Sequence, residues 1–190
     1  MLTILKSLVQ PTLDYCSQLW SPGDQATINK LECVQRHLVN RIKDRALTGL
    51  NYWDKLKELR IYSQERRRER YQIIFLWKIS QGLVTGYDVK FSSNGTRRGR
   101  MIIPNRVQND SPAVIRKARE NSLGVRGSQI FNLLPDSIRT LNTSHIDRFK
   151  NNLDVFLENI PDQPTVTGLG RAAETNSLLH QLPLFYSQTS

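Results

Sequence analysis

The sequence of 190 residues has few cysteines and no long apolar run, and each absence excludes a class of protein. The two cysteines, Cys16 and Cys33, have no neighbouring cysteine at zinc-ligand spacing, and the three histidines are scattered. A zinc site built from one short segment is therefore excluded, and we expect both thiols to be buried as small apolar side chains. No segment approaches the roughly 20 apolar residues that a membrane-spanning helix needs, so we expect no membrane partner. The first nine residues lack the features of a signal peptide, which predicts an intracellular protein.

Motifs for common enzyme chemistry are also absent. The chain has no glycine-rich phosphate loop of the Walker or dinucleotide type, no Gly-x-Ser-x-Gly elbow and no His-Glu-x-x-His zinc motif. Each acidic residue stands alone, whereas two-metal polymerases and nucleases bring carboxylates together around their metal ions. We therefore predict no enzymatic activity from this chain's own residues, and no cofactor. The weaker alternative is an enzyme whose dispersed acids converge in the fold, although we expect a structural role for Asp14, which lies among apolar positions.

Basic residues outnumber acidic ones, and they are unevenly placed. The chain has 27 Lys and Arg against 17 Asp and Glu, which gives a net charge of +10 and a pI near 9.9. Residues 1–150 hold 26 basic and 13 acidic side chains, whereas residues 151–190 hold one basic and four acidic side chains. A basic body with a mildly acidic end indicates a polyanionic partner, and nucleic acid fits better than an anionic membrane.

Apolar residues at helical spacing predict helices through the first half of the chain. Residues 2–20 have this spacing with Pro11 inside it, which predicts two short helices or one kinked helix. The spacing from Ile28 to Ile42 predicts an amphipathic helix that Asp24 can cap. A short helix capped by Asn51 follows, and then a long helix that begins after its cap, Ser63, and ends near Gly82.

The second half of the chain has a different character. Glycines and short alternating apolar pieces between residues 86 and 104 predict loops with one or two short strands. Residues 129–139 and 144–159 are predicted to be helices, and the Thr-, Gly-, Ser- and Gln-rich stretch after Pro161 is predicted to be a flexible tail. We therefore predict a mainly α fold with a helical bundle at residues 1–85, a basic segment with short strands and helices at 86–160, and a tail at 161–190.

Arginines are concentrated at the start of the long helix, which is electrostatically the wrong end. A helix N-terminus carries partial positive charge, so each cation there loses roughly 0.3–1 kcal/mol unless something compensates. A phosphate backbone would compensate, and so would local ion pairs with Glu65 and Glu69. The candidate nucleic-acid-binding residues are Arg66, Arg67, Arg68 and Arg70, with a second cluster of Arg97, Arg98, Arg100, Arg116, Lys117 and Arg119.

Aromatic residues lie beside the first of these clusters. Flat rings stack on unpaired bases for roughly 1–3 kcal/mol, which would suit single strands or hybrids. Tyr71, Phe75 and Trp77, however, belong to a helical stretch whose composition demands burial, so we expect these rings to pack in the core. Tyr62, near the helix start, is left open between the two roles.

Seven segments form a long ordered series: residues 8–20 (LVQPTLDYCSQLW), 28–36 (INKLECVQR), 52–59 (YWDKLKEL), 61–71 (IYSQERRRERY), 120–127 (ENSLGVRG), 131–135 (FNLLP) and 149–154 (FKNNLD). This series resembles the C-terminal part of LINE-type (non-LTR) retrotransposon reverse transcriptases. Such polymerases hold two Mg²⁺ ions in a palm that is missing from this chain, so the resemblance implies a thumb-like helical domain and the segment after it. It also implies RNA and RNA–DNA hybrid as partners, contact with the palm and fingers of the parent polymerase, Mg²⁺ only in the complete polymerase, and a nuclear or cytoplasmic ribonucleoprotein.

Two hypotheses about function result. The first is a fragment of an RNA-directed DNA polymerase that lacks the catalytic palm and binds template, primer or hybrid through its arginine clusters, by shape and charge. The alternative is a helical interaction module that docks on another polypeptide and binds no nucleic acid directly. Binding of nucleic acid by the isolated chain separates the two.

Overall fold

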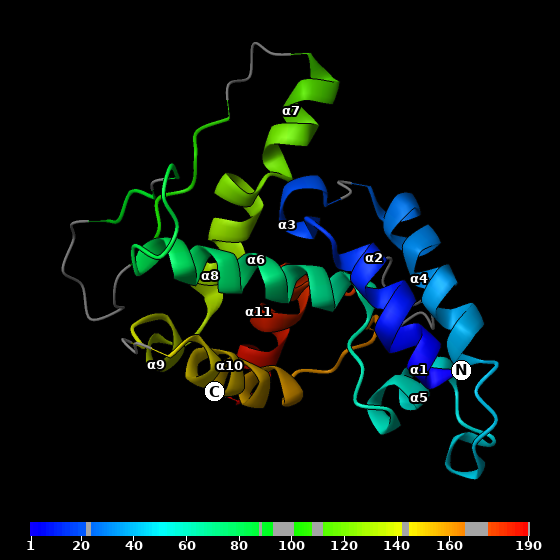
Figure 1. The fold of residues 1–190 in the computed structure, drawn as a ribbon. Helices are drawn as coiled ribbons and strands as arrows, with labels where there is room; N and C mark the ends of the chain where they lie inside the picture. The colour runs from blue at the N-terminus through cyan, green and yellow to red at the C-terminus, as the bar shows by residue number, and fades with distance from the viewer. Residues whose placement is uncertain are drawn as a thin grey trace.

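The protein is mainly helical, as predicted (Figure 1). A computed structural model describes residues 1–21, 24–87, 89–92, 101–107, 112–141, 145–165 and 175–189. Within these ranges the only strand pairing is one antiparallel bridge between Phe91 and Ile102, where one or two short strands were predicted. None of the helices in these ranges is both long enough and apolar enough to cross a membrane.

The N-terminal helical run consists of α1 (Leu2–Ile4), the π-helical turn η1 (Leu5–Val9), α2 (Gln10–Asp14) and, after a break, α3 (Ser17–Trp20). Two short helices are among the predicted alternatives and two helical runs are present, but the break between them does not fall at Pro11. Pro11 lies in the first turn of α2, where a missing amide hydrogen costs least, and the helix continues through it. The chain breaks instead at Cys16, which has a left-handed backbone with φ of 51°.

The next helices begin where the sequence predicts. They are α4 (Gln25–Val39) and α5 (Tyr52–Glu58), and a 3₁₀ turn that was not predicted, η2 (Arg45–Leu47), lies between them. Asp24 accepts a hydrogen bond from the Thr27 amide at 2.9 Å, and Asn51 accepts from two amides in the first turn of α5. The buried face of α4 is less apolar than predicted, because Glu32 and Gln35 are buried in it while Val34 is 44% exposed.

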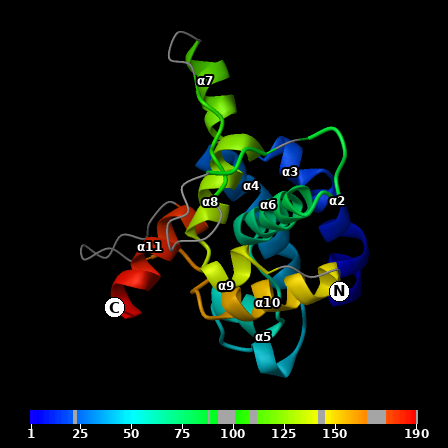
Figure 2. The same cartoon turned by 90° about the vertical axis from the view of Figure 1, so that its left-hand side faces the viewer.

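Helix α6 (Gln64–Ser80) is the central element of the fold. Its cap Ser63 accepts a hydrogen bond from the Arg66 amide at 3.2 Å, and Gly82, with φ of 71°, follows its last turn. Two helices that precede α6 in the chain, α3 and α4, pack on it, and so do two that follow it, α8 and α10, as the two views show (Figures 1 and 2). The two halves of the chain therefore meet on α6.

The second half contains α7 (Ala113–Glu120), the π-helical turn η3 (Leu123–Gly127), α8 (Ser128–Leu133), α9 (Asp136–Arg139), α10 (Ile146–Glu158) and α11 (Leu178–Thr189). The helix predicted at residues 129–139 is divided, because Pro135 separates α8 from α9. The helix predicted at 144–159 is present as α10. The prediction of a flexible tail is wrong for residues 175–189, which include α11 and bury Leu178 and Leu182 completely.

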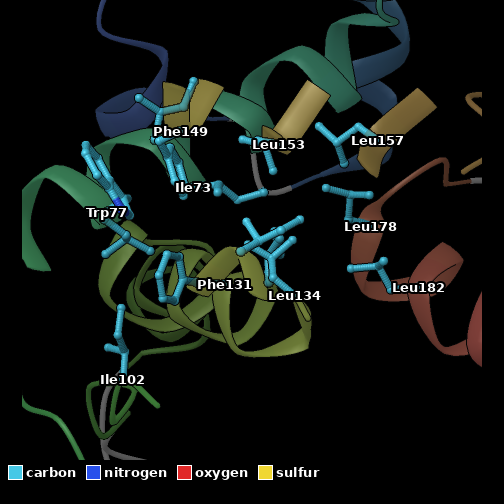
Figure 3. Packing of buried hydrophobic residues seen from close by; sticks show 14 of the residues in the cluster. Ile73, Trp77, Ile102, Phe131, Leu134, Phe149, Leu153, Leu157, Leu178 and Leu182 are labelled. Carbon is cyan, nitrogen blue, oxygen red and sulfur yellow. The ribbon is translucent and has the colours of Figure 1, made fainter. Parts of the chain in front are cut away.

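The larger hydrophobic core surrounds the second half of α6 (Figure 3). The Trp77 ring stacks on Phe149 with 4.5 Å between ring centroids, and its indole N–H donates to the Leu141 carbonyl at 3.1 Å. Trp77 is therefore a packing residue, as predicted. This core takes residues from all three predicted segments, the tail included, and a smaller core forms between η1, α4 and α5 around Leu5, Val39 and Leu56.

Candidate nucleic-acid interface

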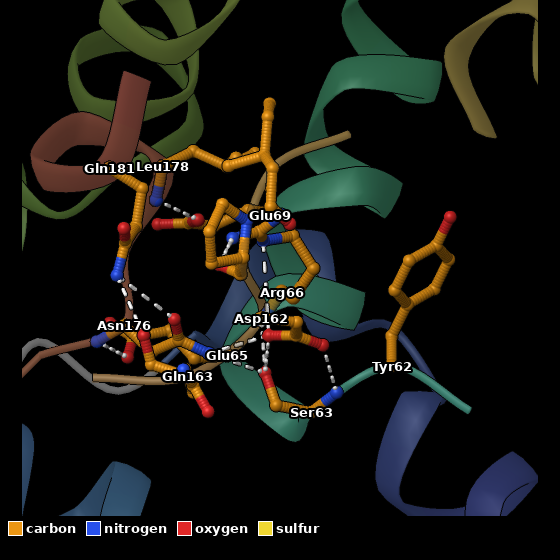
Figure 4. A network of polar contacts seen from close by, with 12 residues as sticks. Tyr62, Ser63, Glu65, Arg66, Glu69, Asp162, Gln163, Asn176, Leu178 and Gln181 are labelled. Atoms are coloured by element: carbon orange, nitrogen blue, oxygen red, sulfur yellow. Dashed lines mark hydrogen bonds and ion pairs between the residues drawn. The ribbon is translucent and has the colours of Figure 1, made fainter. Parts of the chain in front are cut away.

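The first arginine cluster is bonded to groups of the protein itself, and two of its four members are buried, which argues against the prediction that it binds phosphates. Arg66 is fully buried, with an exposed fraction of 0%. Its guanidinium donates to the carbonyls of Ile160 and Pro161, at 3.4 and 2.9 Å, and lies 4.0 Å from Asp162 (Figure 4). Arg66 thus holds the chain that leaves the C-terminus of α10. A nucleic-acid phosphate could reach this guanidinium only if the core opened.

Arg68 is also buried, on the side of α6 that faces the N-terminal helices. One guanidinium nitrogen donates to the Leu13 carbonyl at 2.8 Å, and the group lies over the Trp20 ring at 4.0 Å from its centroid. Burial lowers the pKa of Arg68, and its other two side-chain nitrogens have no hydrogen-bond partner among the described residues. Arg68 therefore anchors α2 and α3 on α6.

Arg67 and Arg70 are half-buried, and both are neutralised by distant acids. Arg67 Nε donates to Asp14 at 2.6 Å, which confirms the structural role expected for that acid. Arg70 binds Asp154 on α10 through two parallel hydrogen bonds of 2.5 and 2.6 Å, a bidentate geometry that guanidinium and carboxylate favour. All four predicted phosphate-binding arginines of α6 are thus engaged by the protein itself.

The two glutamates of the run do not form the predicted local ion pairs either. Glu65 accepts hydrogen bonds from the Thr175 hydroxyl and the Asn176 amide, at 2.9 and 2.8 Å (Figure 4). Glu69 accepts from the Leu178 amide at 2.7 Å and pairs with Arg126 at 2.9 Å. Burial, together with the neighbouring charge of Glu69, raises the pKa of Glu65. These carboxylates hold the start of α11, so the end of the chain is bonded to the start of α6.

Polar contacts also surround the cap of α6. Asp162 accepts from the Ser63 amide and hydroxyl, both at 2.7 Å, and from the Asn176 side chain at 2.5 Å (Figure 4). Glu32 of α4 accepts from the Gln64 amide at 2.7 Å and from the Tyr52 hydroxyl. Acidic side chains from separate parts of the chain therefore provide the negative charge that the helix N-terminus favours.

The second predicted cluster contains cations that lie at the surface. Arg97, Arg98 and Arg100 lie outside the described residues, whereas Arg116, Lys117 and Arg119 are on α7. Helix α7 stands away from the body in both views and has no buried residue (Figures 1 and 2). Lys117 and Arg119 are exposed, and Arg116 is half-exposed at 3.9 Å from Glu120.

Lys117 and the start of α4 lie within electrostatic reach of each other. Hydrogen bonds from Thr27 chiefly lower the pKa of Asp24, and the positive charge of Lys117 lowers it further. Helix α7 also exposes apolar side chains, since Val114 is 81% and Ile115 46% exposed. The surface of α7 therefore combines basic and apolar groups.

A third group of basic residues, from the last turns of α4 to just after α5, was not selected from the sequence. Its seven members are exposed or half-exposed, and residues 36–60 contain only three acids. They are spread singly, so no run of like charge draws attention to them, but counting charge over a window of this length would have found them. They are Arg36, Arg41, Lys43, Arg45, Lys55, Lys57 and Arg60.

The remaining candidates have structural roles or none. Tyr62, for which the sequence left two roles open, packs against the larger core, and its hydroxyl donates to Asp154 at 3.2 Å, so its ring is not a free base platform. Burial raises the pKa of Tyr62. Cys16 is half-buried and Cys33 exposed, so the prediction of two buried thiols is wrong. Among the described residues, no three His, Cys, Asp or Glu side chains gather in a way that could hold a metal ion.

Comparisons with known proteins give no relative from which a function could be transferred. No protein-family model, curated protein sequence or solved structure matches this chain. A function therefore has to be inferred from the fold and from the charge distribution.

Proposed function

We propose that this chain is a nucleic-acid-binding helical module that corresponds to the thumb and C-terminal part of a non-LTR reverse transcriptase and has no polymerase activity by itself. The observation that carries the proposal is α7, a helix that stands off the body and bears Arg116, Lys117 and Arg119 at its surface. The proposal keeps the partner expected from the sequence, but it moves the binding surface from α6 to α7.

The chemistry of α7 suits binding to a phosphate backbone. Three cations lie within four consecutive positions of one exposed helix, and the only acid on the helix is Glu120. Such a surface attracts any polyanion and contacts phosphates without reading bases, which agrees with the lack of a base-reading motif in the sequence. We therefore expect an RNA–DNA hybrid to bind through its backbone and shape, with little dependence on its sequence.

The test is the affinity of the purified chain for a labelled RNA–DNA hybrid, measured by fluorescence anisotropy over a range of salt concentrations. The test variant is Arg116→Gln, Lys117→Gln, Arg119→Gln. The control variant, Lys6→Gln, Lys90→Gln, Arg148→Gln, removes the same charge from exposed positions elsewhere.

We expect the wild-type affinity to fall by about 0.7–0.9 log units per log unit of salt for each phosphate contacted. The α7 variant should bind more weakly and with a shallower salt dependence, while the control should keep most of both. Equal losses in the two variants, or wild-type affinity that salt does not change, would contradict the proposal.

A second candidate function is docking on another polypeptide, such as the palm of the parent polymerase. The observation in its favour is the exposed apolar surface on α7 and near α3, where Tyr15 is 76%, Leu19 72% and Val114 81% exposed. Monomeric proteins rarely expose large contiguous apolar patches, and such patches mark interaction sites. The variant Leu19→Ser, Val114→Ser should weaken docking on a partner and leave hybrid affinity unchanged if the two functions are separate.

A further inference from the structure

A hollow of about 460 Å³ is formed where the chain turns from α4 into α5. Residues 42–45 and 47–49 make most of its wall, and Lys55 of α5 closes it from the other side. The hollow is shallow and opens widely to solvent. The segment between α4 and α5 that lines the hollow lies at the opposite end of the molecule from α7 in both views (Figures 1 and 2). It is therefore a separate feature from the surface of α7.

The charges around this hollow are not balanced by the protein. Lys43, Arg45 and Lys55 line it together with one acid, Asp44. The Asp44 carboxylate accepts a hydrogen bond from the Ala46 amide at 3.0 Å and so serves as the cap of η2. Lys55 Nζ donates to the neutral Asn40 side chain at 3.0 Å.

The contrast with α6 is direct. Every arginine at the start of α6 is bonded to a carboxylate or a carbonyl, whereas neither Lys43 nor Arg45 forms a side-chain ion pair or hydrogen bond with any residue in the described part of the chain. Cations that share a hollow repel one another, and a bound anion removes that repulsion.

The wall of the hollow is preorganised. Leu47, 3% exposed, fixes the turn in the protein, and the Thr48 amide donates to the Arg45 carbonyl at 3.2 Å. Gly49 has φ of 79°, a backbone conformation that other residues rarely adopt, and no atom lies within 4 Å of where its side chain would begin. The wall therefore stays open at Gly49, and a ligand can approach the backbone there.

We propose that this hollow binds a phosphate group with two negative charges, either inorganic phosphate or the phosphate monoester at the end of a nucleic acid. Three cations and one acid give the lining a net charge of +2, which a phosphate dianion neutralises. An arginine fork binds two phosphate oxygens at once, and the two lysines supply further donors around the third. The inference is independent of the proposed function of α7.

The experiment titrates inorganic phosphate into the full chain at about pH 8, where phosphate carries close to two negative charges, and follows binding by NMR chemical shifts and calorimetry. The test variant is Lys43→Gln, Arg45→Gln. The control is Lys90→Gln, Arg148→Gln, which removes the same charge from one exposed Lys and one exposed Arg outside the hollow. A third variant, Asp44→Asn, removes the negative charge and keeps a side-chain oxygen for the Ala46 amide.

We expect saturable binding to wild type, with shifts at residues 42–49. Affinity should fall by about tenfold in the Lys43 and Arg45 variant, because charge and hydrogen bonds to the anion are lost. It should stay within about twofold in the control, which keeps them. It should rise in Asp44→Asn, because the carboxylate no longer repels the anion. Unchanged melting temperatures would show that all variants fold. Non-saturable binding, or equal weakening in the test and control variants, would overturn the inference.

A second arm identifies the source of the phosphate. If the ligand is a nucleic-acid end, a 5′-phosphorylated oligonucleotide should bind more tightly than the same oligonucleotide with a 5′-hydroxyl, and the Lys43 and Arg45 variant should remove the difference. If inorganic phosphate binds while the two oligonucleotides bind equally, the site takes free phosphate. The two proposals fail separately. Hybrid binding that is unchanged in the α7 variant would contradict the function proposed for α7 alone, and absence of saturable phosphate binding would contradict the proposal for the hollow alone.

Discussion

Helices α6 and α7 both carry clustered arginines, yet the structure treats them in opposite ways. At the start of α6 the cations are buried or half-buried and bonded to groups from α2, α10 and the segment after α10. On α7 they lie at the surface of a helix with no buried residue. A similar cluster of basic residues is therefore part of the protein interior in α6 and part of its surface in α7.

The difference shows what decides the role of a basic run. The first half of α6 lies where the N-terminal helices, α10 and the C-terminal segment meet, so each cation is close to an acid or a helix-end carbonyl. Helix α7 has no buried residue, and Lys117 and Arg119 are exposed on it. A charge cluster becomes a candidate ligand site only after these internal partners are accounted for.

The largest expected effect is on stability, at Arg66. Replacing it in Arg66→Ala removes a fully buried side chain, leaves a cavity and strips the Ile160 and Pro161 carbonyls of their donor. We expect a loss of about 3–5 kcal/mol in the free energy of unfolding, measured by denaturant titration. The matched change on α7, Lys117→Ala, should stay within about 0.5 kcal/mol. Similar values for the two variants would break the comparison.

The next effect is a pH dependence from Glu32, which accepts from the first amide of α6. Burial raises the pKa of Glu32 to about 7, although the hydrogen bonds from Tyr52 and Gln64 lower it. The charges of Asp162 and Arg36 have smaller effects, the first raising the pKa and the second lowering it. Between about pH 4.5 and 7 the folded carboxyl stays protonated while the unfolded one ionises, so the folded state binds more protons and stability falls as pH rises.

One group shifted this far changes the free energy of unfolding by about 2–3 kcal/mol across that window. Above about pH 7 its contribution should be constant. Glu32→Gln should flatten this part of the stability profile, measured by denaturant titration at a series of pH values. A variant profile that falls as steeply as the wild-type profile would show that Glu32 does not titrate as described.

A smaller effect is expected for the pair of Arg70 and Asp154. Because the pair is bidentate but partly exposed, a double-mutant cycle of Arg70→Ala and Asp154→Ala should give a coupling of about 1–2 kcal/mol. The control cycle uses Arg116 and Glu120 on α7, whose coupling should not exceed about 0.5 kcal/mol. Equal couplings would remove the distinction between the internal and the external pair.

The smallest change concerns Glu120, the one acid of α7. Glu120→Gln should alter the free energy of unfolding by no more than about 0.5 kcal/mol. It should also strengthen hybrid binding slightly, since it makes the helix more positive. Weaker hybrid binding in this variant would argue against phosphate contact by α7.

The parts of the fold that depend on neighbours in sequence were predictable. Asp24, Asn51 and Ser63 cap helices as expected, because a cap needs only its own side chain and amides up to three residues away. The position of the break after residue 14 was not predicted. Proline is tolerated in the first turn of a helix, so Pro11 does not mark the break, and nothing local marks the left-handed Cys16.

The candidate site was less predictable, because its outcome depends on residues far away in sequence. Asp14 and Asp154, which neutralise Arg67 and Arg70, lie 53 and 84 positions away. Composition after Pro161 indicated a tail, and it outweighed the helical spacing of Leu178 and Leu182, whose burial requires α8 and α10 as partners. The sequence shows where the cations lie along the chain, but it does not show which residues they contact in the fold.

The most direct test of the central claim is arginine-selective chemical modification of the folded chain with and without RNA–DNA hybrid, read residue by residue by mass spectrometry. We predict that Arg116 and Arg119 react in the free protein and are protected by the hybrid, while Arg66 and Arg68 are unreactive in both states. Rapid modification of Arg66 and Arg68 in the free chain, with protection by the hybrid, would contradict the account and return the binding surface to α6.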